Sequence, residues 1–310
     1  MSAIAAVARR PSAYRSSHPL EELTVTLAGG SELRLALKRL GRASPMPRGA
    51  LAQPDFLLDP LREPAVYESV LSSGPPGPPA HVGSLAGPDG ERWLFIEWVR
   101  GGRELYQVGD AAVWDAAARW LAEFHAAMAA DVEQHLRRGR LFVYDAAYYR
   151  VWPERARGFA RARSRTGRAT RFLDWLAPRH DALVEAMRAL PRTVVHGDFN
   201  AANVIAAGHH GDGSVRIAPV DWELAGAGPG LVDLATLVSG GWSDAERARL
   251  VAAYAETSGA PAFSARDLAF ARLHVALRWL GWAPAGWAPP PAQRHDWLAD
   301  AIAITEELGL

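Results

Sequence analysis

The sequence predicts an α+β fold in two parts, a small antiparallel sheet followed by a larger, mainly helical region. Residues 22–28 and 32–40 alternate apolar and polar side chains, which is typical of half-buried strands. From Val113 onward the apolar residues recur with the spacing of an amphipathic helix, first over residues 113–128. The change of pattern along the chain therefore separates a strand-rich part from a helix-rich part.

The N-terminal part is expected to contain a hairpin, a helix and a buried strand. Gly and Ser residues at 29–31 form the turn between the two alternating segments. Residues 32–40 then place their leucines on one face and Lys38 on the other. A helix is expected over residues 59–71, because Asp-Pro at its start suits an N-cap and a first helical position. The apolar run at 92–99 favours a buried strand.

The two parts are expected to meet near Gly101-Gly102, with an N-terminal part at 1–100 and a C-terminal part at 103–310. Apolar patterns in the second part predict further helices and two short strands. The helices are expected at residues 168–176, 180–190, 244–258, 264–282 and from 293 onward, and the strands at 203–206 and 215–220. The two histidines at 209–210 stand next to glycines, so we expect an exposed hairpin loop there instead of a metal site.

Composition excludes several classes of function. The chain has 310 residues and equal numbers of basic and acidic residues, 34 of each, so no net charge attracts it to nucleic acid or to an anionic membrane. The absence of cysteine excludes disulfides, thiolate nucleophiles and Cys-based zinc sites. No apolar run is long enough to span a bilayer, and the N-terminus lacks the order of a signal peptide. We therefore expect a cytoplasmic protein.

Lys38 is the only lysine among the 34 basic residues, and the other 33 are arginine. The compact ammonium of lysine cannot be exchanged for a planar guanidinium at a tight site. A single lysine in an arginine-rich chain can arise by chance, but it also indicates a position where chemistry requires an ammonium group.

The most informative residues are Asp198, Asn203 and Asp221. Asp198 follows His196-Gly197, Asn203 lies five residues further on, and Asp221 lies 18 residues beyond Asn203 at the end of an expected strand. The catalytic loop of protein kinases, H-R-D-x-x-x-x-N, has the same spacing. Each residue alone would fit a turn or a strand end. Together they predict a phosphoryl-transfer site, where a carboxylate accepts a hydroxyl proton and amide and carboxylate oxygens reach Mg²⁺.

With these motifs the chain resembles the aminoglycoside phosphotransferase and choline kinase-like family, a branch of the protein-kinase-like fold. Its catalytic motif matches residues 196–198, and Asp-Trp-Glu at 221–223 stands where protein kinases have Asp-Phe-Gly. Asp-Leu-Ala at 233–235 resembles a downstream motif whose aspartate braces the catalytic loop. The resemblance implies a two-lobed fold, ATP as the donor, Asp198 as the base, and Mg²⁺ held by Asn203 and Asp221. His196 is expected to be structural.

The resemblance also implies a nucleotide site in the N-terminal lobe. Lys38 on the third strand matches the lysine that pairs with the α- and β-phosphates, and Glu63 matches its ion-pair partner. Glu68 is the alternative partner, because Pro64 leaves the start of this helix uncertain.

The hinge between the lobes is expected at about 95–102, and the polar loop at 14–19 takes the place of a glycine-rich loop. Backbone groups at the hinge would meet the adenine edge, and hydroxyls in the loop would donate to phosphate. The residues expected to make these contacts are Glu97, Val99, Ser16 and Ser17.

The predicted function is transfer of the γ-phosphoryl group of ATP to a hydroxyl of a small molecule. Amino sugars, other sugars, amino alcohols, aminoglycosides and natural-product intermediates are all candidate acceptors, and no nucleic acid or membrane partner is expected. Candidate acceptor contacts lie in and near the C-terminal helices: Glu223, Trp242, Asp244, Arg278 and Trp282. Glu223 and Asp244 would suit a cationic group on the acceptor, whereas Arg278 would suit an anionic one.

Two other functions are compatible with this fold. A nucleotide-binding pseudoenzyme would be marked by a broken motif, and a nucleotidyl transferase is expected to have a rearranged catalytic loop. Lys38, Asp198, Asn203 and Asp221 are all present in kinase order, which favours the kinase.

Two clusters have competing explanations. The arginine series at 150–171 is expected to be a solvated face, with binding of an anionic acceptor as the alternative. Trp279, Trp282 and Trp287 are expected in the core, with a wall for stacking on a sugar or a cationic head group as the alternative.

Overall fold

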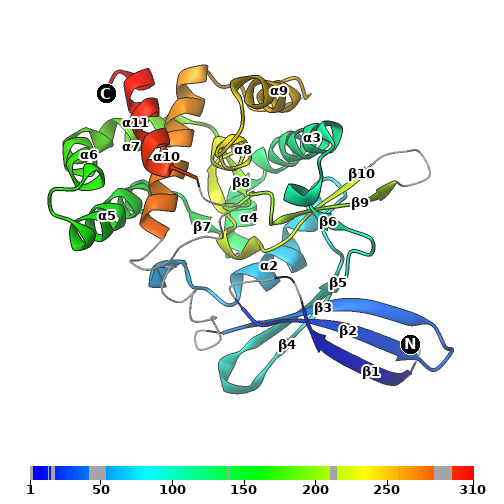
Figure 1. Ribbon diagram of the computed structural model, residues 1–310. Helices are drawn as coiled ribbons and strands as arrows, with labels where there is room; N and C mark the ends of the chain where they lie inside the picture. Colours follow the sequence, from blue (N-terminus) through cyan, green and yellow to red (C-terminus); the bar gives the residue numbers. More distant parts are fainter. Residues whose placement is uncertain are drawn as a thin grey trace.

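The computed structural model describes residues 3–12, 14, 18–41, 54–138, 140–209, 215–257, 259–282 and 295–310. An antiparallel five-stranded sheet forms the N-terminal lobe, and a mainly helical region forms the C-terminal lobe (Figure 1). The expected two-lobed α+β fold is confirmed. Within the described ranges, no helix is long and apolar enough to cross a membrane.

The N-terminal sheet has the strand order β1-β2-β3-β5-β4. Its strands are β1 (Ile4–Pro11), β2 (Leu20–Leu27), β3 (Glu32–Leu40), β4 (His81–Ala86) and β5 (Arg92–Glu97). Strand β3 has the predicted bounds, and β5 ends two residues before the predicted 99. Strand β4 was not predicted, because this edge strand leaves Val82 and Leu85 exposed and so lacks an alternating apolar face.

The two faces of the sheet have different environments. One face carries a small apolar cluster that includes Leu23, Val25 and Leu37. Lys38 lies on the opposite face, because successive side chains of a strand alternate. Residues on that same face, such as Leu40 and Leu94, belong to the main core shared with the helical lobe. The sheet therefore presents Lys38 toward the C-terminal lobe, as the alternation predicts.

Helix α2 (Arg62–Ser69) lies between the sheet and the helical lobe (Figure 1). The prediction of a helix over 59–71 is wrong at both ends. Asp59 Oδ1 accepts the Leu61 N–H at 3.0 Å and so caps a turn that precedes the helix. Glu63 is consequently the second helical residue, and Pro64 the third, where its missing N–H is tolerated.

The C-terminal lobe is built around α10, which is buried on almost every side. Its helices are α3 (Ala111–Ala129), α4 (Val132–Arg138), α5 (Ala146–Arg163), α6 (Arg168–Leu176), α7 (His180–Ala189), α8 (Leu231–Val238), α9 (Asp244–Ala255), α10 (Ala265–Trp282) and α11 (Trp297–Leu308). Helices α5, α7, α8 and α11 pack around α10 (Figure 1). Helices α4 and α8 were not predicted, and the region of α5, which carries part of the arginine series, was expected to be helical but without bounds.

Two small sheets of the C-terminal lobe hold the candidate residues at strand ends. One contains β10, β9 and β6, and the other contains β7, β11 and β8. Their strands are β6 (Arg103–Glu104), β7 (Phe142–Val143), β8 (Arg192–Val195), β9 (Val204–His209), β10 (Val215–Pro219) and β11 (Gly226–Pro229). The loop with Asp198 joins β8 to β9, and Asp221 follows β10 after one residue.

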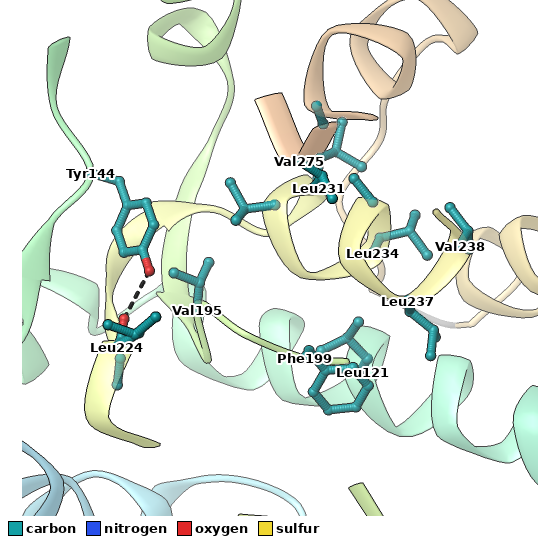
Figure 2. Packing of buried hydrophobic residues seen from close by; sticks show 14 of the residues in the cluster. Leu121, Tyr144, Val195, Phe199, Leu224, Leu231, Leu234, Leu237, Val238 and Val275 are labelled. Carbon is teal, nitrogen blue, oxygen red and sulfur yellow. Dashed lines mark hydrogen bonds between the residues drawn. The ribbon is translucent and has the colours of Figure 1, made fainter. Parts of the chain in front are cut away.

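The core reaches the underside of this loop. Phe199 is fully buried, and its ring is stacked on Trp120 of α3 with centroids 6.1 Å apart. Figure 2 shows Phe199 beside Leu121 and the apolar residues of α8. The packing anchors the loop from the apolar side while its polar residues face the opposite way.

Candidate active site

Gly197 lets the loop turn sharply next to Asp198. Its φ of 83° lies in the left-handed region that disfavours side chains. A Cβ at this position would overlap Tyr144 Oη and the carbonyl oxygen of Leu224. This crowding explains why glycine stands here, where the protein-kinase motif has arginine.

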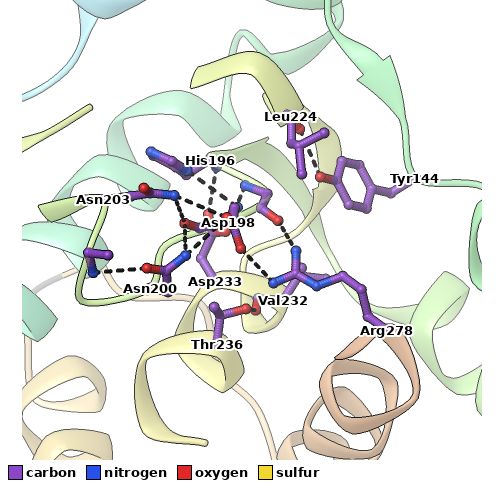
Figure 3. A network of polar contacts seen from close by, with 12 residues as sticks. Tyr144, His196, Asp198, Asn200, Asn203, Leu224, Val232, Asp233, Thr236 and Arg278 are labelled. Carbon is purple, nitrogen blue, oxygen red and sulfur yellow. Dashed lines mark hydrogen bonds and ion pairs between the residues drawn. The ribbon is translucent and has the colours of Figure 1, made fainter. Parts of the chain in front are cut away.

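Asp233 braces the loop from α8. Its buried carboxylate accepts the backbone N–H of His196 at 2.6 Å and that of Gly197 at 2.8 Å (Figure 3). It also lies 3.2 Å from Nε2 of His125, whose Nδ1 lies 2.8 Å from the Tyr254 hydroxyl. The geometry agrees with the structural role implied for Asp233 by the resemblance.

His196 joins the two loops that carry the candidate acids. Its buried ring places Nε2 at 2.9 Å from the Val220 carbonyl oxygen, while Nδ1 accepts the Asp198 N–H at 3.3 Å. Both ring nitrogens are therefore engaged with backbone, which agrees with the expected structural role and leaves neither free for acid or base chemistry.

The carboxylate of Asp198 is held on both oxygens (Figure 3). Oδ1 lies 2.8 Å from Arg278 Nη2, and Oδ2 accepts the side-chain amides of Asn200 and Asn203 at 3.0 Å each. The side chain is 27% exposed. A partly exposed carboxylate with a fixed orientation is suited to receive a proton from a molecule in the solvent-facing space.

Buried Lys38 and Glu63 form a charged group between the lobes with Asp221, whose side chain is partly exposed. Lys38 Nζ lies 2.6 Å from Glu63 Oε2 and makes a short hydrogen bond to Asp221 Oδ1. Glu63 also accepts the Trp222 N–H at 3.2 Å. The alternative partner, Glu68, lies 3.9 Å from His81 instead, so the predicted Lys38–Glu63 pair is present and the alternative is wrong.

The protonation of this group follows from burial and mutual attraction. Burial opposes the charge of Lys38, but the carboxylates of Asp221 and Glu63 outweigh it and raise the pKa of Lys38. Burial raises the pKa of Glu63 more than Lys38 lowers it. Burial acts to raise the pKa of Asp221. The attraction and hydrogen bond of the Lys38 ammonium outweigh this effect, so the pKa of Asp221 is lowered. Lys38 is thus cationic and Asp221 anionic at neutral pH.

Asn203 and Asp221 lie side by side, because the Val220 N–H donates to the Asn203 carbonyl at 2.9 Å. Asp221 has a left-handed backbone, with φ of 68°, which is uncommon for a residue with a side chain. No residue in the described ranges donates a hydrogen bond to Asp221 Oδ2 or to Asn203 Oδ1. Carboxylate and amide oxygens from two residues that line one cleft fit a magnesium ion, which also takes phosphate oxygens and water.

A cleft between the lobes connects these residues to the hinge. Its lining includes Lys38, Glu63, Asn203 and Asp221, together with Val99. The Val99 N–H makes no hydrogen bond to any residue that the structure describes. An unpaired amide at the rim of a partly apolar cleft is a donor for a ligand.

Glu97 lies at the hinge in a role that the sequence did not predict. Its side chain pairs with Arg216 of β10 at 2.7 and 2.8 Å and accepts the Ala80 N–H at 3.1 Å. Arg216 also donates to the carbonyl oxygens of Gly77 and Pro78, so it ties the two lobes together. Ser16 and Ser17 lie outside the described residues.

His18 is a second residue near the site that the sequence did not predict. It is buried, and its Nε2 lies 3.7 Å from Glu223 Oε2. Burial and the neighbouring Lys38 lower the pKa of His18 to about 4, so it is neutral at pH 7. The lone histidine beside Pro19 gave no periodic or motif signal.

The candidate acceptor contacts do not form one cluster. Arg278 is engaged by Asp198, so it is not a free cation for an anionic acceptor. Trp242 packs edge-on against Trp114 at 4.6 Å, and Asp244 is exposed and pairs with Arg247 at 3.0 Å.

The remaining clusters have structural partners. Trp282 stacks on buried Trp152 at 5.6 Å, and Trp279 stacks on Trp297 at 5.5 Å, while Trp287 and the side chains at 209–210 lie outside the described residues. In the arginine series, Arg157 and Arg161 share Asp174. Among the residues that the structure describes, no group of three or more His, Cys, Asp or Glu side chains could hold a metal.

Comparison with known proteins gives a family match and several similar folds. The model of the phosphotransferase enzyme family (APH) matches residues 59–274, which is more than half of the chain. The GDP complex of wild-type aminoglycoside 2'-phosphotransferase-IIIa is similar with a TM-score of 0.58, 15% identity, and coverage of 98% of this chain and 92% of that one. No curated protein matches.

Two further solved structures have the same fold. A choline/ethanolamine kinase family protein from Mesorhizobium loti has a TM-score of 0.54 and 14% identity, covering 97% of this chain and 87% of its own. A microcompartment-associated aminopropanol kinase has a TM-score of 0.56 and 17% identity, covering 97% and 89%.

Proposed function

We propose, from the premise that this chain belongs to the phosphotransferase enzyme family (APH), that it transfers the γ-phosphoryl group of ATP to a hydroxyl of a small molecule. The observation that carries the proposal is the arrangement of four side chains. Lys38, Asn203 and Asp221 line one cleft, and the Asn203 amide also binds the carboxylate of Asp198. The nucleotide would lie between an N-terminal lobe at 1–100 and a C-terminal lobe at 103–310.

In this proposal the adenine lies at the hinge and the phosphates extend toward Lys38. The N–H of Val99, which has no acceptor among the described residues, suits the N1 acceptor of adenine, and the Glu97 carbonyl would face its amino group. The GDP in the similar aminoglycoside 2'-phosphotransferase-IIIa structure supports a purine nucleotide in this cleft. The ammonium of Lys38, held by Glu63, would neutralise α- and β-phosphate oxygens.

Asn203 and Asp221 would hold Mg²⁺ through the oxygens that no described protein group occupies. When bound, the ion would neutralise charge on the transferring phosphates.

Asp198 would orient the acceptor hydroxyl and take its proton. The hydroxyl oxygen forms a bond to the γ-phosphorus, the bond from that phosphorus to the bridging oxygen breaks, and ADP leaves. Arg278 and two asparagine amides keep the carboxylate fixed during this exchange. Positioning and charge stabilisation supply most of the catalysis in such transfers.

One acidic candidate contact lies near the site. Glu223 is among the acids that raise the pKa of Lys38, whereas Arg278 is engaged by Asp198 and Asp244 is exposed and pairs with Arg247. An acceptor with an amine, such as an amino alcohol, an amino sugar or an aminoglycoside, would suit the carboxylate of Glu223. Neutral sugars and natural-product intermediates are the second choice.

The test is ATP consumption with Mg²⁺ across a panel of amino alcohols, amino sugars, aminoglycosides and neutral sugars, with Asp198→Asn as the blank. We expect one class to respond and the variant to lose roughly 10²–10⁴-fold in rate. Mass spectrometry of the product would show an added phosphoryl group; an added nucleotidyl group would support the transferase alternative. If no acceptor responds and calorimetry detects no binding of ATP·Mg²⁺, the kinase assignment fails.

The single lysine offers an independent test of the nucleotide site. An ATP analogue with an amine-reactive acyl phosphate can modify only Lys38 or the N-terminal amine. We expect labelling of the peptide that contains Lys38, protection by ATP·Mg²⁺, and no such label in Lys38→Arg. Labelling confined to the N-terminus would contradict the proposed site.

A further inference from the structure

We propose that Arg278 is a positioning residue for Asp198, which sets the orientation of the base and of the backbone next to it. The inference rests on the proposed kinase function. It replaces the expectation that Arg278 contacts an anionic acceptor.

Arg278 holds the loop at two points. Nη2 lies 2.8 Å from Asp198 Oδ1, and Nη1 donates a short hydrogen bond to the Gly197 carbonyl oxygen. A guanidinium presents its N–H groups in a rigid planar fork, so the two contacts fix the carboxylate relative to the backbone. The single ammonium of lysine carries the same charge but cannot reproduce both directions.

The guanidinium itself has a rigid support. Arg278 is 4% exposed and lies on α10, where the residues before it are buried. One turn further on, a Cβ at Gly281 would overlap the Trp152 backbone, so α10 and α5 cross in close contact. Arg155 adds a hydrogen bond from Nε to the Gly281 carbonyl at 3.0 Å. Helix α10 therefore cannot shift without disturbing this crossing.

Among the described groups that surround the Arg278 guanidinium, only Asp198 carries a negative charge that can pair with it. The titratable groups near Arg278 are the phenols of Tyr144 and Tyr148 and, on its own helix, His274. Burial, with the nearby Arg278 charge, lowers the pKa of His274, and burial raises those of both tyrosines, so all three are neutral. Within the described ranges, Asp198 is the only carboxylate at ion-pair distance from Arg278.

The two carboxylate oxygens of Asp198 are held by different parts of the structure. Oδ2 is held by amides from its own loop, Asn200 and Asn203, and Asn203 is also the proposed magnesium ligand. Oδ1 is held from outside the loop, by Arg278 alone among the described residues. Arg278 is therefore the contact that fixes the carboxylate of Asp198 from outside its loop.

The experiment compares Arg278→Lys and Arg278→Met with wild type in steady-state release of ADP from ATP·Mg²⁺. Water and the best acceptor of the panel above serve as acceptors, and calorimetry of ATP·Mg²⁺ binding reports on the fold of each variant. Arg272→Lys is the matched control, because Arg272 is a largely buried arginine on the same helix whose ion-pair partner is Glu307. Arg278→Lys keeps the buried charge, so it tests geometry even if Arg278→Met unfolds.

We expect kcat to fall roughly 10–100-fold in Arg278→Lys, because misplacing a reacting group by about 1 Å can cost about 10²-fold. The KM values for ATP and acceptor and the calorimetric affinity should stay near wild type, and Arg272→Lys should be active. An unchanged kcat, or a raised acceptor KM with unchanged kcat, would overturn the positioning role alone. Absence of ATP turnover in wild type would overturn the proposed function, and the inference with it.

Discussion

Removal of the ammonium at Lys38 should destabilise the protein strongly, because two carboxylates share it. The Lys38 side chain is 6% exposed, lies 2.6 Å from Glu63 and also binds Asp221. Removing one partner of a buried ion pair costs about 3–5 kcal/mol, since the other charge stays buried and uncompensated. We expect Lys38→Met to lower the free energy of unfolding by about this amount and to abolish phosphoryl transfer.

The second arm of this prediction removes the charge of Glu63. Glu63→Gln leaves Lys38 paired with Asp221, so the loss should be smaller, about 1–3 kcal/mol. Lys38→Met with Glu63→Gln removes both buried charges of one pair. The combined loss should then be less than the sum of the two single losses, by about 0.5–3 kcal/mol for residues in direct contact.

Urea denaturation curves of wild type, the two single variants and the double variant measure the coupling energy between Lys38 and Glu63. Glu68→Gln is the matched control, because Glu68 lies on the same helix α2 with a side chain 49% exposed. Its change in unfolding free energy should stay within about 0.5 kcal/mol. Strictly additive losses for Lys38 and Glu63, or a Lys38→Met protein as stable as wild type, would refute the argument that the ammonium compensates buried carboxylates.

Three further substitutions test other parts of the site and core. Gly197→Ala forces a Cβ against Tyr144 at positive φ and should lower both kinase activity and the denaturation midpoint, whereas Gly208→Ala, with open space around it, should change neither. Asp233→Ala leaves two backbone N–H groups unpaired, each at about 1–3 kcal/mol, and should lower the unfolding free energy more than Asp233→Asn. Burial lowers the pKa of His180 from 6.5 to about 4. The unfolded chain therefore binds the extra proton in this window, and wild type should lose about 2 kcal/mol of stability between pH 7 and 5 through this residue. Denaturation curves should show that His180→Gln loses correspondingly less, and an equal loss would contradict it.

The alternation of apolar and polar residues predicted the strands of the N-terminal sheet where it runs without interruption. Strand β3 has the predicted bounds because its alternation continues without interruption, and Lys38 faces the helical lobe for the same reason. The bounds and the buried face of helix α5 were not predicted, although its buried Tyr148, Trp152 and Ala156 recur every four residues. The arginines between them and Pro153 obscured that apolar face.

Contacts between distant segments left no local signal. Arg278 and Asp198 lie 80 positions apart, so the sequence suggested only an anionic acceptor as the partner of Arg278. Arg216 and Glu97 are separated by 119 positions and meet only when the two lobes fold together. The resemblance to a known family, in contrast, implied the Lys38–Glu63 pair, which the structure contains.

The loop that carries Asp198 is fixed by two helices that bind the backbone on either side of Gly197. The Gly197 N–H donates to Asp233 of α8, and its carbonyl accepts from Arg278 of α10. The backbone on either side of Gly197 is thus held by groups of opposite charge, one anionic acceptor and one cationic donor. Helices α8 and α10 also pack against each other, so the two supports come from one packed pair of helices. In the proposed mechanism, these two supports would keep the carboxylate of Asp198 in a fixed orientation toward the acceptor.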